Sequence, residues 1–343
     1  MTSNVYFNEG DVINNRFTVI QMLGEGGFGA VYKVITSDNQ TFAMKSETHN
    51  PDGVLKMEVL ILKLVNAKGY AHFCRCIDAG KTSTATLYMV MTLLGPNLSE
   101  LRSDLPDQKF SMGCSLSVGK QCVEAIQEIH SVGFLHRDLK PSNFAIGPET
   151  NSRRILMFDF GLARRYRNSD GTVRPPRVAP GFRGTIRYAP LSCHVYREQS
   201  RKCDLETWFY QQVELTRGAL PWRCSDDRNR VGVFKEKCRY GLGLKEFLSG
   251  CPAEYVEILR YLDRLRYFDT PKYKLILDLM DQALESLNLS EYPYDWESTS
   301  KLYQKFMAKK EADRLAEKQA KGPRPTLTAT NNVIYTASNS KDS

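Results

Sequence analysis

The sequence predicts an α+β fold with two lobes, a small β-rich lobe with one helix and a larger α-helical lobe. Strand patterns dominate the first quarter of the chain, and helical patterns dominate the remainder. Gly95-Pro96 is typical of a connection between the two parts. Strands that precede helices as a block indicate an α+β fold, because parallel α/β folds alternate the two elements. We expect the small lobe at about residues 16–94 and the large lobe at about residues 95–310.

The small lobe is expected to contain several strands and one helix. Phe17–Ile20 and Gln40–Lys45 have strand patterns. Residues 55–65 carry apolar side chains at helical spacing, which places Glu58 on a helix. Leu87–Met91 is a short apolar strand that ends just before the connection.

The large lobe is expected to be built from helices. Helical patterns cover residues 115–131, 203–217, 253–266 and 271–288. Residues 1–15 are interpreted as an N-terminal extension, and residues 311–343 as a charged and then disordered tail. From Pro323 onward the chain is rich in Pro, Thr, Asn and Ser with few large apolar groups, which is typical of disorder.

The composition is that of a soluble globular enzyme. Hydrophobic residues make up 42% of the 343 residues and charged residues 25%, and no run of 18 uncharged apolar residues predicts a transmembrane helix. The polar, acidic start lacks the pattern of a signal peptide. Nine scattered cysteines suit the reduced thiols of a cytosolic protein. We expect a cytoplasmic monomer that binds neither membranes nor nucleic acid, with the nucleus and the cytoskeleton open as further locations.

The net charge of +8 is unevenly distributed. One loop-like stretch contains a cluster of seven arginines opposed only by Asp170. These are Arg164, Arg165, Arg167, Arg174, Arg177, Arg183 and Arg187. Such a cluster predicts an acidic or phosphorylated partner, with Arg183 and Arg187 as the candidate anion site. The alternative is that these arginines pair internally or bind a solvent anion.

Two segments carry the residues needed for phosphoryl transfer. Residues 136–143 read HRDLKPSN, and Asp159-Phe160-Gly161 begins sixteen residues after Asn143. Phosphoryl transfer passes through a loose, highly charged transition state that needs cations, a positioned nucleophile and a carboxylate. Asp138 is the candidate base and Lys140 the candidate cation for the γ-phosphate. Asn143 and Asp159 offer the hard oxygen ligands that suit Mg²⁺.

Three neighbours of these residues are predicted to have other roles. His136 and Phe160 are interpreted as packing residues. Arg137 would either pair with a phosphorylated loop or be held by a constitutive acidic or backbone partner.

A glycine-rich loop predicts the nucleotide site. Gly24, Gly26 and Gly29 form a GxGxxG pattern between two strands, and glycine lets the backbone approach phosphates closely. A dinucleotide-binding turn would open directly into a helix. Lys45 would bind the α- and β-phosphates, and Glu58 would hold Lys45 as an ion pair. The alternative is a surface lysine and a surface glutamate.

These motifs together resemble those of eukaryotic protein kinases, over about residues 16–300. The finer pattern resembles the casein kinase 1 group. Residues 92–98 are similar to its hinge, with Met91 at the gatekeeper position. Residues 183–189 and 218–222 are similar to its substrate loop and helix end.

One further run, residues 173–177 followed by 181–185, is similar to the tau-tubulin kinase branch of that group. The resemblance implies a two-lobed protein kinase fold, the cofactors ATP and Mg²⁺, and tubulin or a microtubule-associated protein as partner. The residues it assigns to ATP binding are Leu23, Gly24, Glu25, Gly26, Gly27, Phe28, Gly29, Ala30, Val31, Ala43, Lys45, Glu58, Met91 and Leu94.

The sequence departs from the kinase pattern at four places. Residues 189–191 read Ala-Pro-Leu, so the usual glutamate and its buried pair with an arginine are expected to be absent. Cys203 stands before Asp204 where the group is usually acidic. Gln211-Gln212 lies in a helix expected to be central and buried, so its amides need polar neighbours. Asp226-Asp227 replaces a basic segment that reads primed acceptors.

The predicted function is that of a Ser/Thr protein kinase that transfers the γ-phosphoryl of MgATP to protein hydroxyls and favours acidic or pre-phosphorylated sites. The competing class is a nucleotide-binding pseudokinase or scaffold, which usually lacks Lys45, Asp138 or Asp159; all three are present. A small-molecule kinase of this fold would lack the run at residues 183–189.

Overall fold

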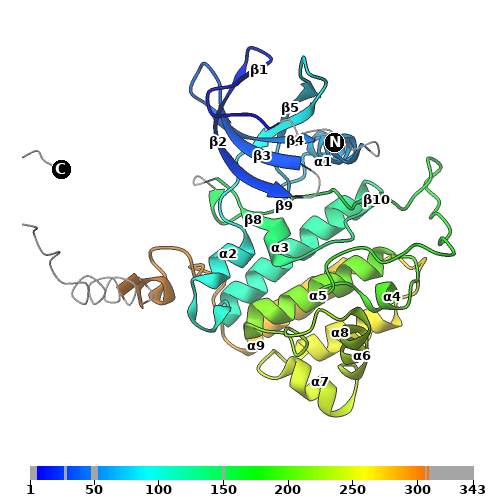
Figure 1. The fold of residues 1–343 in the computed structure, drawn as a ribbon. Helices are drawn as coiled ribbons and strands as arrows, with labels where there is room; N and C mark the ends of the chain where they lie inside the picture. Colours follow the sequence, from blue (N-terminus) through cyan, green and yellow to red (C-terminus); the bar gives the residue numbers. More distant parts are fainter. Residues whose placement is uncertain (1–5, 27–28, 48–52, 149–150, 306, 309–343) are drawn as a thin grey trace, which may run out of the picture.

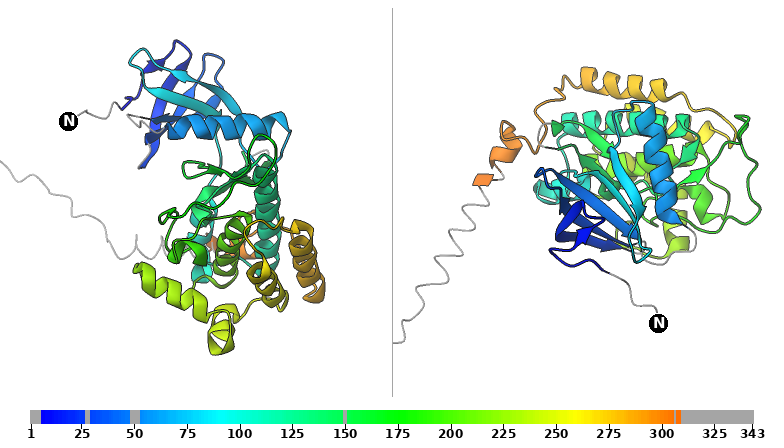
Figure 2. Two further views of the ribbon diagram at one scale, coloured as in Figure 1. Left: turned by 90° about the vertical axis from the view of Figure 1, so that its right-hand side faces the viewer. Right: turned by 90° about the horizontal axis from the view of Figure 1, so that it is seen from above.

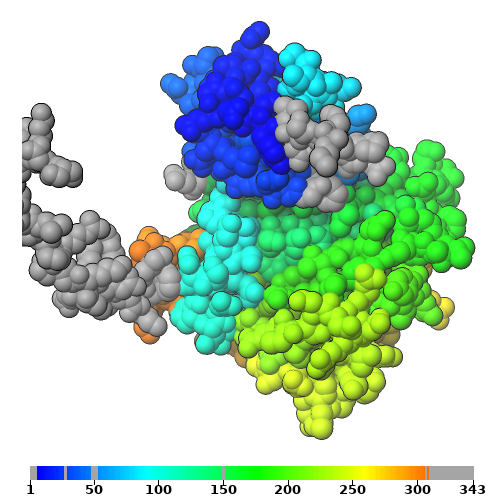
Figure 3. Space-filling view, in the orientation of Figure 1, coloured from blue at the N-terminus to red at the C-terminus, as the bar shows by residue number. Residues whose placement is uncertain are grey.

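A computed structural model describes residues 6–26, 29–47, 53–148, 151–305 and 307–308. The predicted disorder of the tail lies outside these residues, as do Gly27 and Phe28. The chain forms a small upper lobe and a larger lower lobe (Figure 1; Figure 3). Among the described residues, no helix combines the length and apolar character required to cross a membrane.

The small lobe is a six-stranded antiparallel sheet with one helix against it (Figure 2). Its strands, in the spatial order β1-β2-β3-β4-β6-β5, are β1 (Val12–Ile13), β2 (Phe17–Gly26), β3 (Gly29–Ile35), β4 (Thr41–Glu47), β5 (Cys76–Lys81) and β6 (Leu87–Thr92). Alternation along β3 buries Ala30, Tyr32 and Val34 on one face. Helix α1 (Val54–Ala67) contacts β4, β5 and β6.

The large lobe is mostly helical. Its helices are α2 (Leu98–Ser103), α3 (Met112–Ser131), α4 (Leu191–His194), α5 (Arg201–Arg217), α6 (Arg228–Lys237), α7 (Gly241–Leu248), α8 (Glu254–Arg264) and α9 (Tyr273–Ser286), with 3-10 turns at Pro106–Gln108 and Pro141–Asn143. Short strand pairs lie beneath the small lobe: β7 (Phe134–Leu135) with β10 (Arg164–Arg165), and β8 (Phe144–Ile146) with β9 (Ile155–Met157). The four predicted helices correspond to α3, α5, α8 and α9, whereas α2, α4, α6 and α7 have no sequence-based prediction.

Helix α5 is the buried centre of the large lobe, as the sequence predicts. The amide nitrogens of its two glutamines have polar partners, whereas neither side-chain oxygen has a hydrogen-bond partner among the described residues. Gln212 Nε2 donates to Ser115 O and to the Tyr255 hydroxyl, at 2.9 and 2.6 Å. Gln211 Nε2 lies 3.6 Å from Cys122 Sγ. Gly119 on α3 allows this packing, because a Cβ there would lie 2.2 Å from Gln212 Oε1. Helix α3 therefore provides the polar face that α5 needs.

Candidate active site

A cleft of about 920 Å³ lies between the two lobes. Most residues predicted to bind nucleotide line it: Leu23, Gly24, Glu25, Gly26, Gly29, Val31, Ala43, Lys45, Glu58, Met91 and Leu94. Asp138, Lys140 and Asp159 also line it. Ala30 does not, because its side chain is buried in the core of the small lobe. The cleft wall also includes residues that the sequence does not single out, among them Leu62, Cys74, Met89 and Ala145.

Lys45 connects the two lobes across the cleft. Its Nζ lies 2.6 Å from Glu58 Oε1 on α1 and 3.3 Å from Asp159 Oδ1 below. Burial by itself would lower the pKa of Lys45, but the two carboxylates outweigh it and raise that pKa, so the ammonium stays charged. Burial raises the pKa of Glu58 to about 7, although Lys45 opposes this shift. The arrangement is the predicted ion pair, and the surface alternative is wrong.

Asp138 is held in a fixed orientation. Its Oδ1 accepts hydrogen bonds from Thr185 N and Thr185 Oγ1, both at 2.8 Å. Its Oδ2 accepts one from Lys140 Nζ at 2.9 Å. Thr185 is therefore a further site residue; its position in the predicted substrate loop is the only sequence signal that could have indicated it. Asp138 and Lys140 therefore present a carboxylate and an ammonium side by side in the cleft.

The donor set suits Mg²⁺ more than a transition metal. Asn143 Nδ2 donates to Asp138 O at 2.8 Å, which fixes the amide group in the loop. Asn143 and Asp159 contribute one amide oxygen and one carboxylate, both hard ligands. Mg²⁺ typically takes one or two such groups and completes its shell with water and phosphate oxygens. No cluster of three or more His, Cys, Asp or Glu side chains occurs within the described ranges.

Asp204 on α5 anchors the catalytic loop from below. Its two carboxylate oxygens accept hydrogen bonds from the backbone amides of His136 and Arg137, at 2.8 and 2.9 Å. His130 Nε2 lies 2.8 Å from the same carboxylate. Burial would raise the pKa of Asp204, but these partners lower it, so the group is a buried anion.

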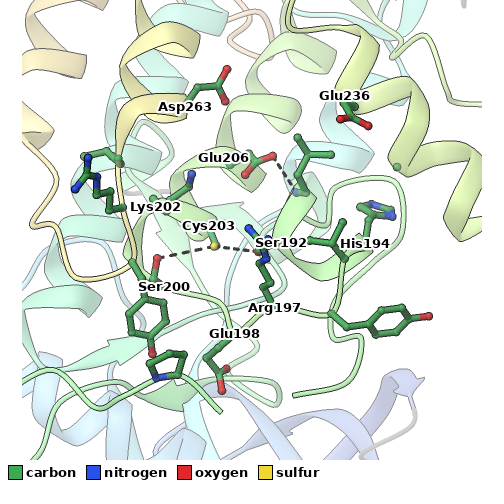
Figure 4. A pocket seen from close by; sticks show the side chains of 18 of the residues that line it. Ser192, His194, Arg197, Glu198, Ser200, Lys202, Cys203, Glu206, Glu236 and Asp263 are labelled. Carbon is green, nitrogen blue, oxygen red and sulfur yellow. Dashed lines mark hydrogen bonds between the residues drawn. The ribbon is translucent and has the colours of Figure 1, made fainter. Parts of the chain in front are cut away.

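The neighbouring Cys203 has a separate environment. Its Sγ contacts the hydroxyls of Ser192 and Ser200, at 3.2 and 3.9 Å, beside a pocket next to α4 (Figure 4). Burial raises the pKa of the thiol to about 11, so it is neutral. The departure at Cys203 therefore does not disturb the anchor formed by Asp204.

The packing roles predicted near the catalytic loop are observed. His136 and Phe160 are buried, and their rings pack edge to face with centroids 5.5 Å apart. Arg137 Nε donates to Leu162 O at 2.7 Å. Of the two alternatives for Arg137, the structure has the constitutive backbone partner.

Members of the arginine cluster differ in how they are paired. Arg177 forms a two-point ion pair with Glu198, with Nη2 3.1 Å from Oε1. Arg187 Nη1 lies 3.5 Å from Glu214 Oε1, at the limit of a hydrogen bond. Arg183 is exposed and donates to Phe182 O. Internal pairing thus describes Arg177, whereas Arg183 is open to an anion in solution.

The end of the activation segment lacks the usual glutamate and its buried pair with an arginine, as expected, because Leu191 stands in its place. Glu206 on α5, labelled in Figure 4, supplies a carboxylate beside this backbone. Its Oε1 accepts from Leu191 N at 3.0 Å and lies 2.7 Å from Arg239 Nη2. The pair of Glu206 and Arg239 forms because helix α5 places a different glutamate beside the same backbone.

Comparisons with known proteins agree with this geometry. A family model for the protein kinase domain matches residues 17–321. A probable serine/threonine-protein kinase of Dictyostelium discoideum is 39% identical over 86% of this chain, which spans 59% of that protein's length. Serine/threonine-protein kinase spe-6 of Caenorhabditis elegans is 36% identical over 85% of this chain and 78% of its own. Casein kinase I homolog 3 of Schizosaccharomyces pombe is 32% identical over 83% of this chain and 66% of its own.

Proposed function

Because the chain belongs to the protein kinase family and has its two-lobed fold, we propose that it is an active Ser/Thr protein kinase that uses MgATP. The observation that supports this most directly is the network of Lys45, Glu58 and Asp159 across the cleft, with distances of 2.6 and 3.3 Å. Phosphoryl transfer requires a lysine that is positioned to bind the phosphates, here by Glu58 of α1. It also requires an aspartate that is positioned to bind the metal ion.

Each residue of the cleft has a defined task in this proposal. ATP would bind between the lobes, where Lys45 would hold its α- and β-phosphates. Asn143 and Asp159 would hold Mg²⁺, which would supply positive charge against the phosphate oxygens. Asp138 orients the substrate hydroxyl and accepts its proton, while Lys140 offsets the charge that develops on the transferred group.

The substrates in this proposal are protein Ser/Thr sites with acidic or phosphorylated neighbours. Arg183 is exposed beside the site, and Arg187 has long contacts, both at 3.5 Å, with Glu214 Oε1 and Arg223 O, so both offer positive charge to an anion. The similarity of residues 173–177 and 181–185 to the tau-tubulin kinase branch supports a cytoplasmic kinase of tubulin or microtubule-associated proteins.

The test is phosphate transfer from MgATP to a Ser/Thr peptide library, with Asp159→Asn as the comparison. We expect transfer by the wild type and a loss of at least about 100-fold in the variant. Equal activity in both proteins would refute the role of Asp159. A thermal shift with MgATP but no transfer to any peptide would instead support the pseudokinase alternative.

The preference for acidic sites needs a separate variant. Charge reversal at Arg183 and Arg187 should abolish that preference while transfer to neutral peptides continues. An unchanged preference would refute the anion site and leave the kinase activity itself unaffected.

A further inference from the structure

Lys235 is a fully buried lysine whose role is outside the catalytic machinery described above. It lies on α6 with an exposed fraction of 0%, next to residues 183–189. A buried ammonium loses its hydration, so it is tolerated only where acceptors replace the water.

The three N–H groups of Lys235 have three acceptors. Nζ donates to the carbonyls of Ile186 and Ala189, at 2.8 and 2.6 Å. The third acceptor is His194 Nε2, at 3.2 Å. His194 Nδ1 lies 2.8 Å from Arg228 O, which assigns its proton to Nδ1 and leaves Nε2 as the acceptor.

Aromatic rings surround the same ammonium. Nζ lies 4.9 Å from the ring centroid of Tyr210 and 5.5 Å from that of Trp222, within the range of cation–π attraction. Trp222 also donates from its indole nitrogen to the carbonyl of Arg187 at 2.8 Å. Three carbonyls of one short segment, those of residues 186, 187 and 189, are therefore held by Lys235 and Trp222.

This segment is adjacent to the reacting atoms. Thr185 immediately precedes it and donates to Asp138, so a hydroxyl presented to Asp138 belongs to a peptide that must pass along residues 183–189. Fixing the carbonyls toward the interior of the large lobe also fixes the surface that the segment offers to that peptide.

Stability alone is a poor explanation for the ammonium. Burial lowers the pKa of Lys235 to about 7, which means that holding the charge in place has a cost. A methionine of similar length would fill the same space without that cost. The amine group, charged or neutral, does something that a methionine cannot, namely donate hydrogen bonds to two carbonyls at once.

We propose that Lys235 is a positioning residue for protein substrates: it sets the backbone of residues 186–189 and thereby the affinity for the peptide, without contacting ATP. This inference rests on the proposed kinase function. Lys235 acts through the segment above it, so it belongs to peptide recognition and not to the chemical step.

The test compares Lys235→Met with Lys237→Met, an exposed lysine on the same helix, in steady-state assays on one peptide from the library. For Lys235→Met we expect the peptide KM to rise about tenfold, the equivalent of about 1.4 kcal/mol, with kcat and the KM for ATP unchanged. Lys235→Arg should recover part of the loss because it keeps the donors and the charge. An unchanged peptide KM, or an equal fall of kcat, would overturn the proposal.

A second measurement does not depend on catalysis. Hydrogen exchange should be faster in residues 183–189 of Lys235→Met and unchanged around residues 136–143. This comparison remains decisive if the wild type transfers no phosphate, so failure of the kinase function and failure of the positioning role are distinguishable. If Lys235→Met does not fold, Lys235→Ala, which also removes the N–H donors, provides the same comparison; equal exchange in that variant and the wild type refutes the role.

Discussion

The catalytic loop and the substrate segment meet at Asp138 but are anchored by groups of opposite polarity. In the catalytic loop, the backbone amides of His136 and Arg137 donate to the Asp204 carboxylate. In the substrate segment, the carbonyls of Ile186 and Ala189 accept from the Lys235 ammonium. A buried anion thus fixes one wall of the site and a buried cation the other. The two walls should therefore respond differently to substitution and to pH.

The largest expected effect is on the chemical step where the walls meet. Asp138→Asn should reduce phosphate transfer by about 10³-fold, because the amide cannot accept the substrate proton. A peptide phosphorylation assay measures this loss. Binding of MgATP, followed by thermal shift, should persist. The exposed Asp104→Asn is the matched control, and a variant of Asp138 with near wild-type transfer would contradict its assignment as base.

The next largest effect is expected when a substitution removes the anionic anchor of the catalytic loop. Asp204→Asn should lower the free energy of unfolding by about 3 kcal/mol, because buried amides and His130 lose a charged partner. Denaturant unfolding measures the change. The partly exposed Asp278, paired with Lys274 on α9, provides the control: Asp278→Asn should cost under about 1 kcal/mol. Equal losses of the free energy of unfolding in the two variants would contradict the anchoring role of Asp204.

A smaller effect is expected at the end of the substrate segment. Glu206→Gln should lower the free energy of unfolding by about 2 kcal/mol, since Arg239 stays buried with a weaker partner. The same unfolding measurement applies, with the exposed Glu236→Gln on α6 as control. No destabilisation would mean that the glutamate–arginine pair contributes little here.

The smallest effect concerns pH at the cationic wall. Burial, followed by the neighbouring Lys235, lowers the pKa of His194 to about 4. The unfolded chain therefore binds more protons than the folded chain between about pH 6.5 and pH 4, and the stability contributed by neutral His194 is lost as pH falls through this window. The wild type should lose about 1 kcal/mol more than His194→Gln when unfolding is measured at pH 7 and at pH 5. An equal loss of the free energy of unfolding between pH 7 and pH 5 in the two proteins would contradict this expectation.

The residues that line the cleft could be predicted from the sequence more fully than the residues that hold them in place. Lys45, Asp138 and Asp159 lie where the motifs place them, because each motif sets a short local geometry of loop, strand or turn. Ala30 was expected to contact the nucleotide, but the alternation of side chains along β3 directs the Ala30 side chain into the core of the small lobe. The sequence shows that Leu191 replaces the usual glutamate but not that Glu206 pairs with Arg239 beside the same backbone, because a sequence pattern identifies the missing residue and not its spatial neighbours.

What the sequence determined by itself was the set of candidate reacting groups, since each lies in a short local motif. What only the tertiary structure decided was how these groups are held. Thr185 lies 47 residues from Asp138, and Lys235 lies 49 from Ile186. Such contacts depend on which faces of α5 and α6 meet the loops, and hydrophobic periodicity defines a buried face without identifying its partner. The sequence does not distinguish a buried lysine such as Lys235 from a surface lysine; only the folded structure shows its acceptors.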